Sequence, residues 1–265
     1  MVVTPVILAA RGSRNPLAAQ ATWALARRVG ALRAGSRVKS AFLSVEVPDL
    51  RSALAKEAAL AYRGVVVVPL LLGEGRTARV TVAARIESAR EGGLSLAVSV
   101  AEVIGPVAGV GSDDRALELV VAALLRRLKE ASVVVTGRHS AAGPLFTRQG
   151  GRPDAIVLAA AGSGASRAMQ TATLVSRWLG TAAGVPCQVA FTSIGTPSVA
   201  DAIGAWRARG ATQVAVATYL LAPGALYDRV ASASVHAGGI AVSAPLGDAP
   251  EVAELVLHRA DGVMR

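Results

Sequence analysis

The sequence contains one cysteine, three histidines and few aromatic residues, and each scarcity narrows the possible functions. The single cysteine, Cys187, excludes an internal disulfide bond and a metal site built from cysteines alone. Phe, Trp and Tyr make up 3% of the chain, which is too few for the stacking platforms that bind single-stranded nucleic acid. Because the sequence also contains no nucleic-acid-binding motif, we expect no nucleic-acid partner.

Long apolar runs are also missing. A helix that spans a membrane needs about 20 mostly apolar residues. The longest runs here, at 65–72 and 155–161, have the length of strands. The segment 2–10 carries no basic leader of the kind that opens a signal peptide. We therefore expect no membrane association and a cytoplasmic location.

The composition that remains favours parallel β-sheets covered by helices. Apolar residues make up 52% of the chain, and with so few aromatics the core must consist of Val, Leu, Ile and Ala. Strands of parallel sheets are buried on both faces and have this character. The formal net charge of +10 indicates either a solvated surface or a site for an acidic ligand.

The chain contains two similar halves. Residues 6–13 (VILAARGS) match 156–163 (IVLAAAGS), and the pair Ala41-Phe42 with Pro48 matches Ala190-Phe191 with Pro197. Further along, the segment 71–80 matches 220–230. The landmarks keep their order at an offset of about 150 residues. Such self-similarity is the signature of an internal duplication.

Each half alternates strand and helix patterns, which predicts a parallel sheet with right-handed crossovers. In the first half we expect strands near 2–10, 37–44, 64–72 and 94–104, and helices near 16–34, 48–62, 77–91 and 112–130. The prediction is an α/β protein with two domains, each a four-stranded parallel sheet with helices on both faces. The expected boundaries are 1–130 for the first domain and 154–265 for the second. Residues 131–153, rich in glycine, are expected to form a linker.

Ligands of open parallel sheets bind beyond the carboxyl ends of the strands. Two loops are expected there, one after the first strand at 10–14 and one after the third strand at 72–79. In the first loop, Gly12 allows a close backbone approach, and Ser13 is expected to cap the next helix, whose N–H groups favour an anion. Guanidinium groups suit carboxylate ligands because they pair with them in a bidentate way. The two loops offer as ligand-binding candidates Arg11, Gly12, Ser13, Arg14, Gly73, Gly75, Arg76 and Arg79.

These segments together resemble the sirohydrochlorin chelatase family. Residues 7–16 (ILAARGSRNP) resemble the family opening LLAxHGSRxP, and 64–73 (GVVVVPLLLG) resembles its third strand and loop. Segments 41–43, 48–50, 158–163, 219–230 and 243–247 extend the likeness to the long, duplicated form found in actinobacteria. The resemblance implies two flavodoxin-like, chelatase-like domains facing each other across a cleft. It also implies a lyase that inserts Co²⁺ or Fe²⁺, as substrate metal, into an acidic tetrapyrrole for cobalamin or sirohaem synthesis, without a permanently bound cofactor.

The sequence departs from the family at the residues that carry this chemistry. By alignment, Arg11 and Thr77 stand at the positions of the two family histidines, and Ser44 stands where an acidic residue is common. Arginine stays protonated and cannot serve as a base or as a metal ligand. The weak substitutes for a metal ligand are His139, Glu46 and Glu74. The other histidines, His236 and His258, are expected near the ends of helices, as surface groups.

Three interpretations remain open. The chain is an active chelatase with unusual ligands, a tetrapyrrole-binding relative that carries or regulates without metal insertion, or an enzyme of different chemistry on the same scaffold. In the third case Arg11 would bind a substrate carboxylate.

Overall fold

The computed structural model describes residues 4–73, 76–106, 113–133 and 152–264, and only the backbone of 76–79 and 132–133 within them. The chain divides into two compact units. Unit 1 comprises residues 1–105 and 247–265, and unit 2 comprises residues 106–246. None of the helices in the described ranges is both long enough and apolar enough to span a membrane.

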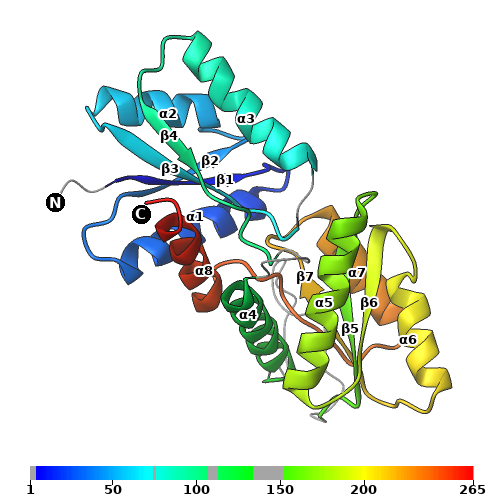
Figure 1. Cartoon of the computed structure of the whole chain (residues 1–265). Helices are drawn as coiled ribbons and strands as arrows, with labels where there is room; N and C mark the ends of the chain where they lie inside the picture. The colour runs from blue at the N-terminus through cyan, green and yellow to red at the C-terminus, as the bar shows by residue number, and fades with distance from the viewer. Residues whose placement is uncertain (1–3, 74–75, 107–112, 134–151, 265) are drawn as a thin grey trace. The chain divides into compact units, whose positions relative to one another are not determined.

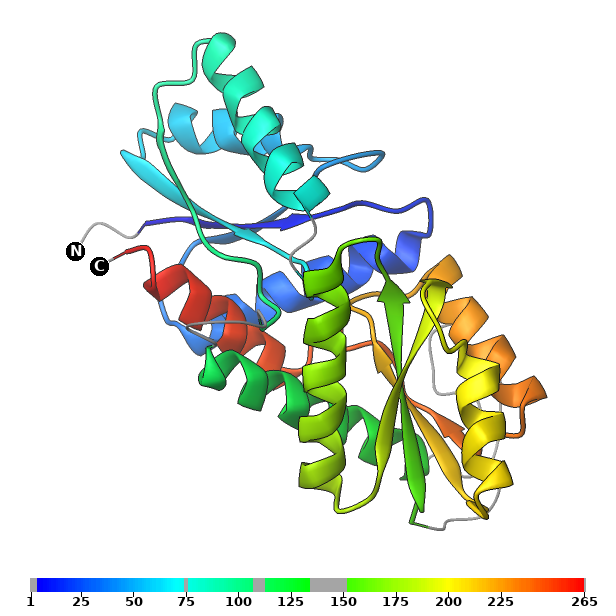
Figure 2. The ribbon, with the colours of Figure 1, turned by 45° about the vertical axis from the view of Figure 1, so that its right-hand side comes forward.

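Unit 1 is a parallel four-stranded sheet between two pairs of helices (Figure 1). Its strands are β1 (Val6–Ala10), β2 (Val38–Phe42), β3 (Gly64–Pro69) and β4 (Ala97–Val100), in the order β2-β1-β3-β4. Helices α1 (Pro16–Leu32) and α8 (Pro250–Asp261) lie side by side on one face, and α2 (Leu50–Ala59) and α3 (Arg76–Glu91) cover the other (Figure 2).

Unit 2 repeats this plan. Its strands are β5 (Ala155–Gly162), β6 (Cys187–Ile194), β7 (Val214–Tyr219) and β8 (Ala241–Val242), all parallel and in the order β6-β5-β7-β8. Helices α4 (Asp114–Val133) and α5 (Ser166–Ala183) pack together, as do α6 (Val199–Ala208) and α7 (Ala225–His236), on the other face. The prediction of two α/β domains with helices on both faces is confirmed.

The residues that make up the two units differ from the expected domains 1–130 and 154–265, because each half of the sequence contributes its last helix to the other unit. Helix α4 follows β4 of unit 1 but packs on β7 and β8 of unit 2. Helix α8 follows β8 of unit 2 but packs on α1 and β3 of unit 1. The expected linker 131–153 also begins inside a helix, since α4 continues to Val133, and residues 134–151 lie outside the described ones.

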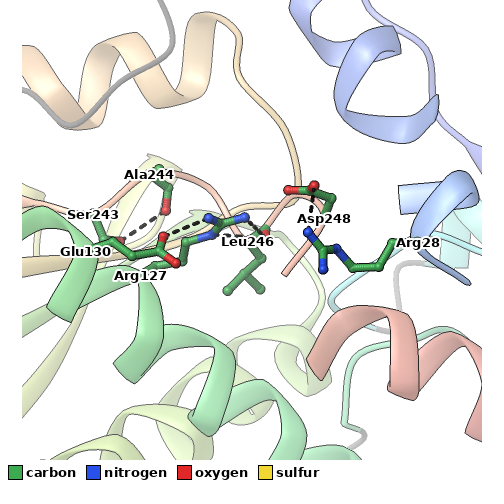
Figure 3. A network of polar contacts seen from close by, with 7 residues as sticks. All are labelled: Arg28, Arg127, Glu130, Ser243, Ala244, Leu246 and Asp248. Atoms are coloured by element: carbon green, nitrogen blue, oxygen red, sulfur yellow. Dashed lines mark hydrogen bonds and ion pairs between the residues drawn. The ribbon is translucent and has the colours of Figure 1, made fainter. Parts of the chain in front are cut away.

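Arginines fix each exchanged helix to its unit. In unit 2, Arg127 of α4 donates to the Leu246 carbonyl oxygen, at 3.0 Å from Nη2, and pairs with Glu130 (Figure 3). In unit 1, Arg259 of α8 is buried and its Nη2 donates to the Gly105 carbonyl oxygen at 3.0 Å. Arg28 of α1 forms an ion pair with Asp248, which lies just before α8 (Figure 3). Arg33 of α1 forms another with Asp261, the last residue of α8.

The core of each unit follows from its central strands. Val65–Val68 of β3 and Ile156–Ala160 of β5 are almost entirely buried, as expected for strands covered on both faces. A partly buried ion pair lies beside the core of unit 1, where Arg37 binds the buried Glu57 of α2 through two hydrogen bonds of 2.6 and 3.0 Å. Both Glu57 oxygens therefore have a partner, as a buried carboxylate requires.

Helices α2 and α6 begin after a proline and a capping side chain. Pro48 and Pro197 each follow a cis peptide bond, and the helices start two residues later, at Leu50 and Val199. The N-caps are Asp49, which accepts from the Ser52 N–H at 2.7 Å, and Ser198, which forms a capping box with Asp201. The hydrogen bonds from Ser52 lower the pKa of Asp49.

Replacing Asp49 by alanine should lower the free energy of unfolding by about 1 kcal/mol at neutral pH, because α2 loses its cap. Since the folded-state pKa is lowered, the cap's charge contributes fully above the ordinary carboxyl pKa of about 4 and is lost below it. The difference between the two proteins in urea unfolding should therefore shrink as the pH falls from 5 to 3. Asp49→Asn is the matched control, which should keep most of the cap and lose the pH dependence.

Candidate functional site

The candidate site lies at the carboxyl edge of the unit 1 sheet. Strands β2, β1 and β3 are adjacent and parallel, so their carboxyl ends share one edge. Arg11 follows β1 directly, Ser44 lies two residues beyond β2, and the chain leaves β3 through residues 70–73. The backbone of Arg76, Thr77 and Arg79 forms the first turn of α3. Arg11 and Ser44 therefore stand in two loops that leave the same edge, and Thr77 stands in the first turn of the helix that follows the third strand.

The first two loops are in direct contact. Gly12 has a φ of +88°, and a β-carbon there would lie 2.0 Å from the Ser44 carbonyl oxygen. The Ser44 hydroxyl donates to the Arg11 carbonyl oxygen at 2.8 Å. The close approach expected of Gly12 is thus made to the protein's own backbone. The Ser44 hydroxyl therefore connects the loop after β2 to the loop after β1.

The start of α1 differs from the expectation for Ser13. The N-cap is Asn15, whose side chain accepts from the Leu17 N–H at 3.0 Å. The Ser13 hydroxyl instead accepts from the Asn15 N–H at 3.0 Å, which forms a turn before the helix. The cap shifts because Pro16 occupies the first helical position, where its missing N–H costs nothing.

Glu46 also reaches this loop. One of its carboxylate oxygens accepts from the Ser13 N–H at 3.3 Å, so Glu46 lies at the edge as a partly buried anion. Arg11 and Arg14 are exposed on either side of Gly12 and Ser13. The loop after β1 thus presents two exposed guanidinium groups, and the carboxylate beside it is already hydrogen-bonded.

Sequence reasoning missed Arg85, which also lies at the carboxyl edge of the sheet. From α3 its Nη2 donates to the Leu43 carbonyl oxygen at 3.1 Å, one residue before Ser44. It also contributes to the lowered pKa of Asp49, after the Ser52 hydrogen bonds. The periodicity of α3 marks Arg85 only as a surface position, so no pattern in the sequence could have indicated this contact.

The described residues offer little for a metal ion. No three His, Cys, Asp or Glu side chains group together within them to hold one. His236 ends α7, with its Nδ1 2.7 Å from the Ser232 carbonyl oxygen, and His258 is exposed on α8, as expected. The candidates His139 and Glu74, together with Gly75, lie outside the described residues.

Cys187 is not available as a thiolate ligand or nucleophile near neutral pH. It lies at the start of β6 in unit 2. Burial raises the pKa of the Cys187 thiol to about 12. The thiolate that would bind a metal or attack a substrate is therefore a negligible fraction at neutral pH.

Unit 2 repeats the loop contact without the arginine. Gly162 has a φ of +85°, and a β-carbon there would lie 2.0 Å from the Ile194 carbonyl oxygen. The Ser193 hydroxyl donates to the carbonyl oxygen of Ala161, at 2.6 Å. Ala161 corresponds to Arg11. The loop contact therefore belongs to the repeated fold, whereas the guanidinium at this position is particular to unit 1.

Comparison with known proteins finds a match along nearly the whole described chain. The family model named CbiX matches residues 5–131 and 155–263. A search of curated protein sequences finds no significant match.

Several solved structures share the fold. SirB from Bacillus subtilis, solved with Fe³⁺, superposes with a TM-score of 0.74 at 19% identity, covering 99% of this chain and 96% of that one. The sirohydrochlorin chelatase SirB from Bacillus subtilis subspecies spizizenii, in complex with cobalt, gives 0.72 at 18% identity, covering 99% and 95%. CbiX, the terminal enzyme for siroheme biosynthesis in denitrifying bacteria, gives 0.62 at 20% identity, covering 98% and 100%. At these identities the likeness establishes the fold.

Proposed function

Because the chain belongs to the CbiX family of sirohydrochlorin chelatases, we propose that it binds an acidic tetrapyrrole at the carboxyl edge of the unit 1 sheet and inserts Co²⁺ or Fe²⁺ poorly or not at all. The observation that carries this proposal is Arg11. It is exposed directly after β1, and the sequence resemblance assigns it to the position of the first family histidine. The other altered positions, Ser44 and Thr77, offer hydroxyl groups, which are poor ligands for these metals.

A permanent positive charge at position 11 opposes the substrate metal. Two unit charges 4 Å apart repel by about 1 kcal/mol in bulk water and by about 4 kcal/mol at the effective dielectric constant of a protein surface. A divalent ion doubles these values. Neutral imidazole both binds metal and accepts the pyrrole protons, whereas guanidinium does neither.

The same charge favours an anionic ligand. Carboxylates form short, charge-assisted hydrogen bonds with guanidinium groups, often in pairs. Arg11 and Arg14 flank a loop whose backbone is fixed by Gly12 and Ser44. The contact between Glu46 and the Ser13 N–H supports the proposal, because it shows that a carboxylate fits at this loop.

A spectral titration with sirohydrochlorin, with and without Co²⁺, tests the proposal. We expect saturable binding in both cases, and no change of the absorption spectrum toward the metallated pigment over hours. Rapid metallation would instead support an active chelatase with unusual ligands. If the pigment does not bind, the scaffold serves another chemistry and the proposal is wrong.

Replacing Arg11 by methionine should weaken pigment binding about five- to tenfold, since an exposed charge-assisted hydrogen bond is lost. The matched control is Arg63→Met, which removes the same charge from an exposed position just before β3, at the opposite edge of the sheet. Arg63→Met should bind as the unmodified chain does. Equal losses in the two variants would indicate an effect of net charge alone.

A further inference from the structure

Val45, in the loop that joins β2 to α2, has a backbone conformation that valine rarely adopts. Its φ is +51°, in the left-handed region, and its side chain is 68% exposed. A β-branched residue in this region is an outlier, because its branched β-carbon crowds the backbone. Such strain persists only where the surroundings impose it, and it gathers at functional sites.

The duplication shows that the fold does not require this strain. The connection Phe42–Pro48 of unit 1 corresponds to Phe191–Pro197 of unit 2, and in each the Phe N–H donates to the proline carbonyl oxygen. In each, a serine hydroxyl also closes onto the preceding loop. In unit 2, however, the residue with positive φ is Gly195, at 120°. Unit 2 thus places the positive φ on a glycine one position later in the connection, whereas the residue that corresponds to Val45, Ile194, ends strand β6.

The place of Val45 is defined by its neighbours in the chain. Ser44 binds the carbonyl oxygen of Arg11, and Glu46 accepts from the Ser13 N–H. Val45 lies between them, so it stands beside the loop that carries Arg11 and Arg14. Val47, which is 80% exposed, extends the apolar surface of the same loop.

We propose that Val45 is a ligand-contacting residue whose exposed side chain packs against the apolar face of the tetrapyrrole ring, while the neighbouring arginines bind the carboxylates at its rim. This inference rests on the proposed function. A flat ring with an acidic rim requires an apolar contact next to cationic groups, and the β2–α2 loop supplies that contact. The left-handed conformation leaves the side chain of Val45 exposed beside the loop that carries the arginines. In unit 2 the corresponding Ile194 is also exposed, but the loop beside it carries Ala161 in place of the arginine.

The substitution Val45→Asn tests both parts of the inference, because asparagine adopts the left-handed region readily but offers no apolar contact. We expect its thermal midpoint to rise by a few degrees and its affinity for sirohydrochlorin to fall about fivefold. Val45→Gly should lose a similar amount of affinity. The control is Leu60→Asn, which is 50% exposed at the end of α2, at the opposite edge of the sheet, and should leave the affinity unchanged.

The outcomes separate this inference from the proposed function. If the unmodified chain binds the pigment and Val45→Asn binds equally well, Val45 makes no contact and the inference is wrong, while the proposed function stands. If the thermal midpoint of Val45→Asn is equal to or below that of the unmodified chain, Val45 is not strained and the inference is wrong. If the unmodified chain fails to bind, both proposals fall together.

Discussion

Replacing Arg11 and Thr77 by histidine should raise the rate of metal insertion into sirohydrochlorin about 100-fold over that of the unmodified chain. A positioned acid–base group contributes roughly 10²–10⁴-fold to a rate, and here it would return together with a metal ligand. Arg11→His also removes the charge that repels the substrate metal. The measurement is the rate of appearance of the metallated pigment's absorption at saturating Co²⁺.

Adding Ser44→Glu should tighten Co²⁺ binding further but make the protein easier to unfold. The carboxylate supplies an oxygen ligand at the third altered position. It cannot donate a hydrogen bond, however, so the contact of the Ser44 hydroxyl with the Arg11 carbonyl oxygen is lost. We expect the triple variant to bind Co²⁺ more tightly than the double variant in a titration, and to unfold at a lower urea concentration.

Arg14→His combined with Thr77→His is the matched control for the rescue. It places an imidazole in the same loop with the same change of net charge, but three residues away from the family position and with Arg11 retained. We expect its insertion rate to stay near that of the unmodified chain. If the unmodified chain already matches the Arg11→His, Thr77→His variant, another base does the work, with His139 the first candidate, and the proposed loss of activity is wrong.

The repeat and the strand pattern made the fold predictable from the sequence. The apolar runs 65–72 and 155–161 became β3 and β5, and the offset of about 150 residues anticipated two sheets of the same order. The exchange of α4 and α8 could not be foreseen. An amphipathic helix needs an apolar surface to cover, and its sequence does not say which of two similar sheets provides it. The contacts of Arg127 and Arg259 with distant carbonyl oxygens specify that choice only in three dimensions.

The candidate site was predictable in position but not in its contacts. The glycine after β1 indicated a close approach, and Gly12 makes one. Ser13 was expected to cap α1, yet Asn15 does so, because both residue types cap well and only the backbone path selects one. No sequence pattern indicated Arg85, because its contact is with a residue 42 positions away in the chain. None indicated Val45, because the unusual feature there is a backbone angle.

Replacing Gly12 by alanine should lower the free energy of unfolding by about 3 kcal/mol or more. The left-handed conformation alone costs an L-residue about 1–2 kcal/mol. The new β-carbon would also lie 2.0 Å from the Ser44 carbonyl oxygen, so the β1 and β2 loops must separate. That separation breaks the hydrogen bond between Ser44 and Arg11, so the loss should reach at least the upper end of the usual range for single substitutions. Urea unfolding followed by circular dichroism measures the loss.

Two further glycines separate the contribution of the backbone angle from that of the clash. Gly35 has a similar φ of +76°, but a β-carbon there meets nothing within 4 Å, so Gly35→Ala should cost only about 1–2 kcal/mol. Gly162 repeats both features of Gly12 in unit 2, and Gly162→Ala should be as damaging as Gly12→Ala. If Gly12→Ala costs no more than Gly35→Ala, the β1 and β2 loops are not in close contact, and the geometry assigned to the site is wrong.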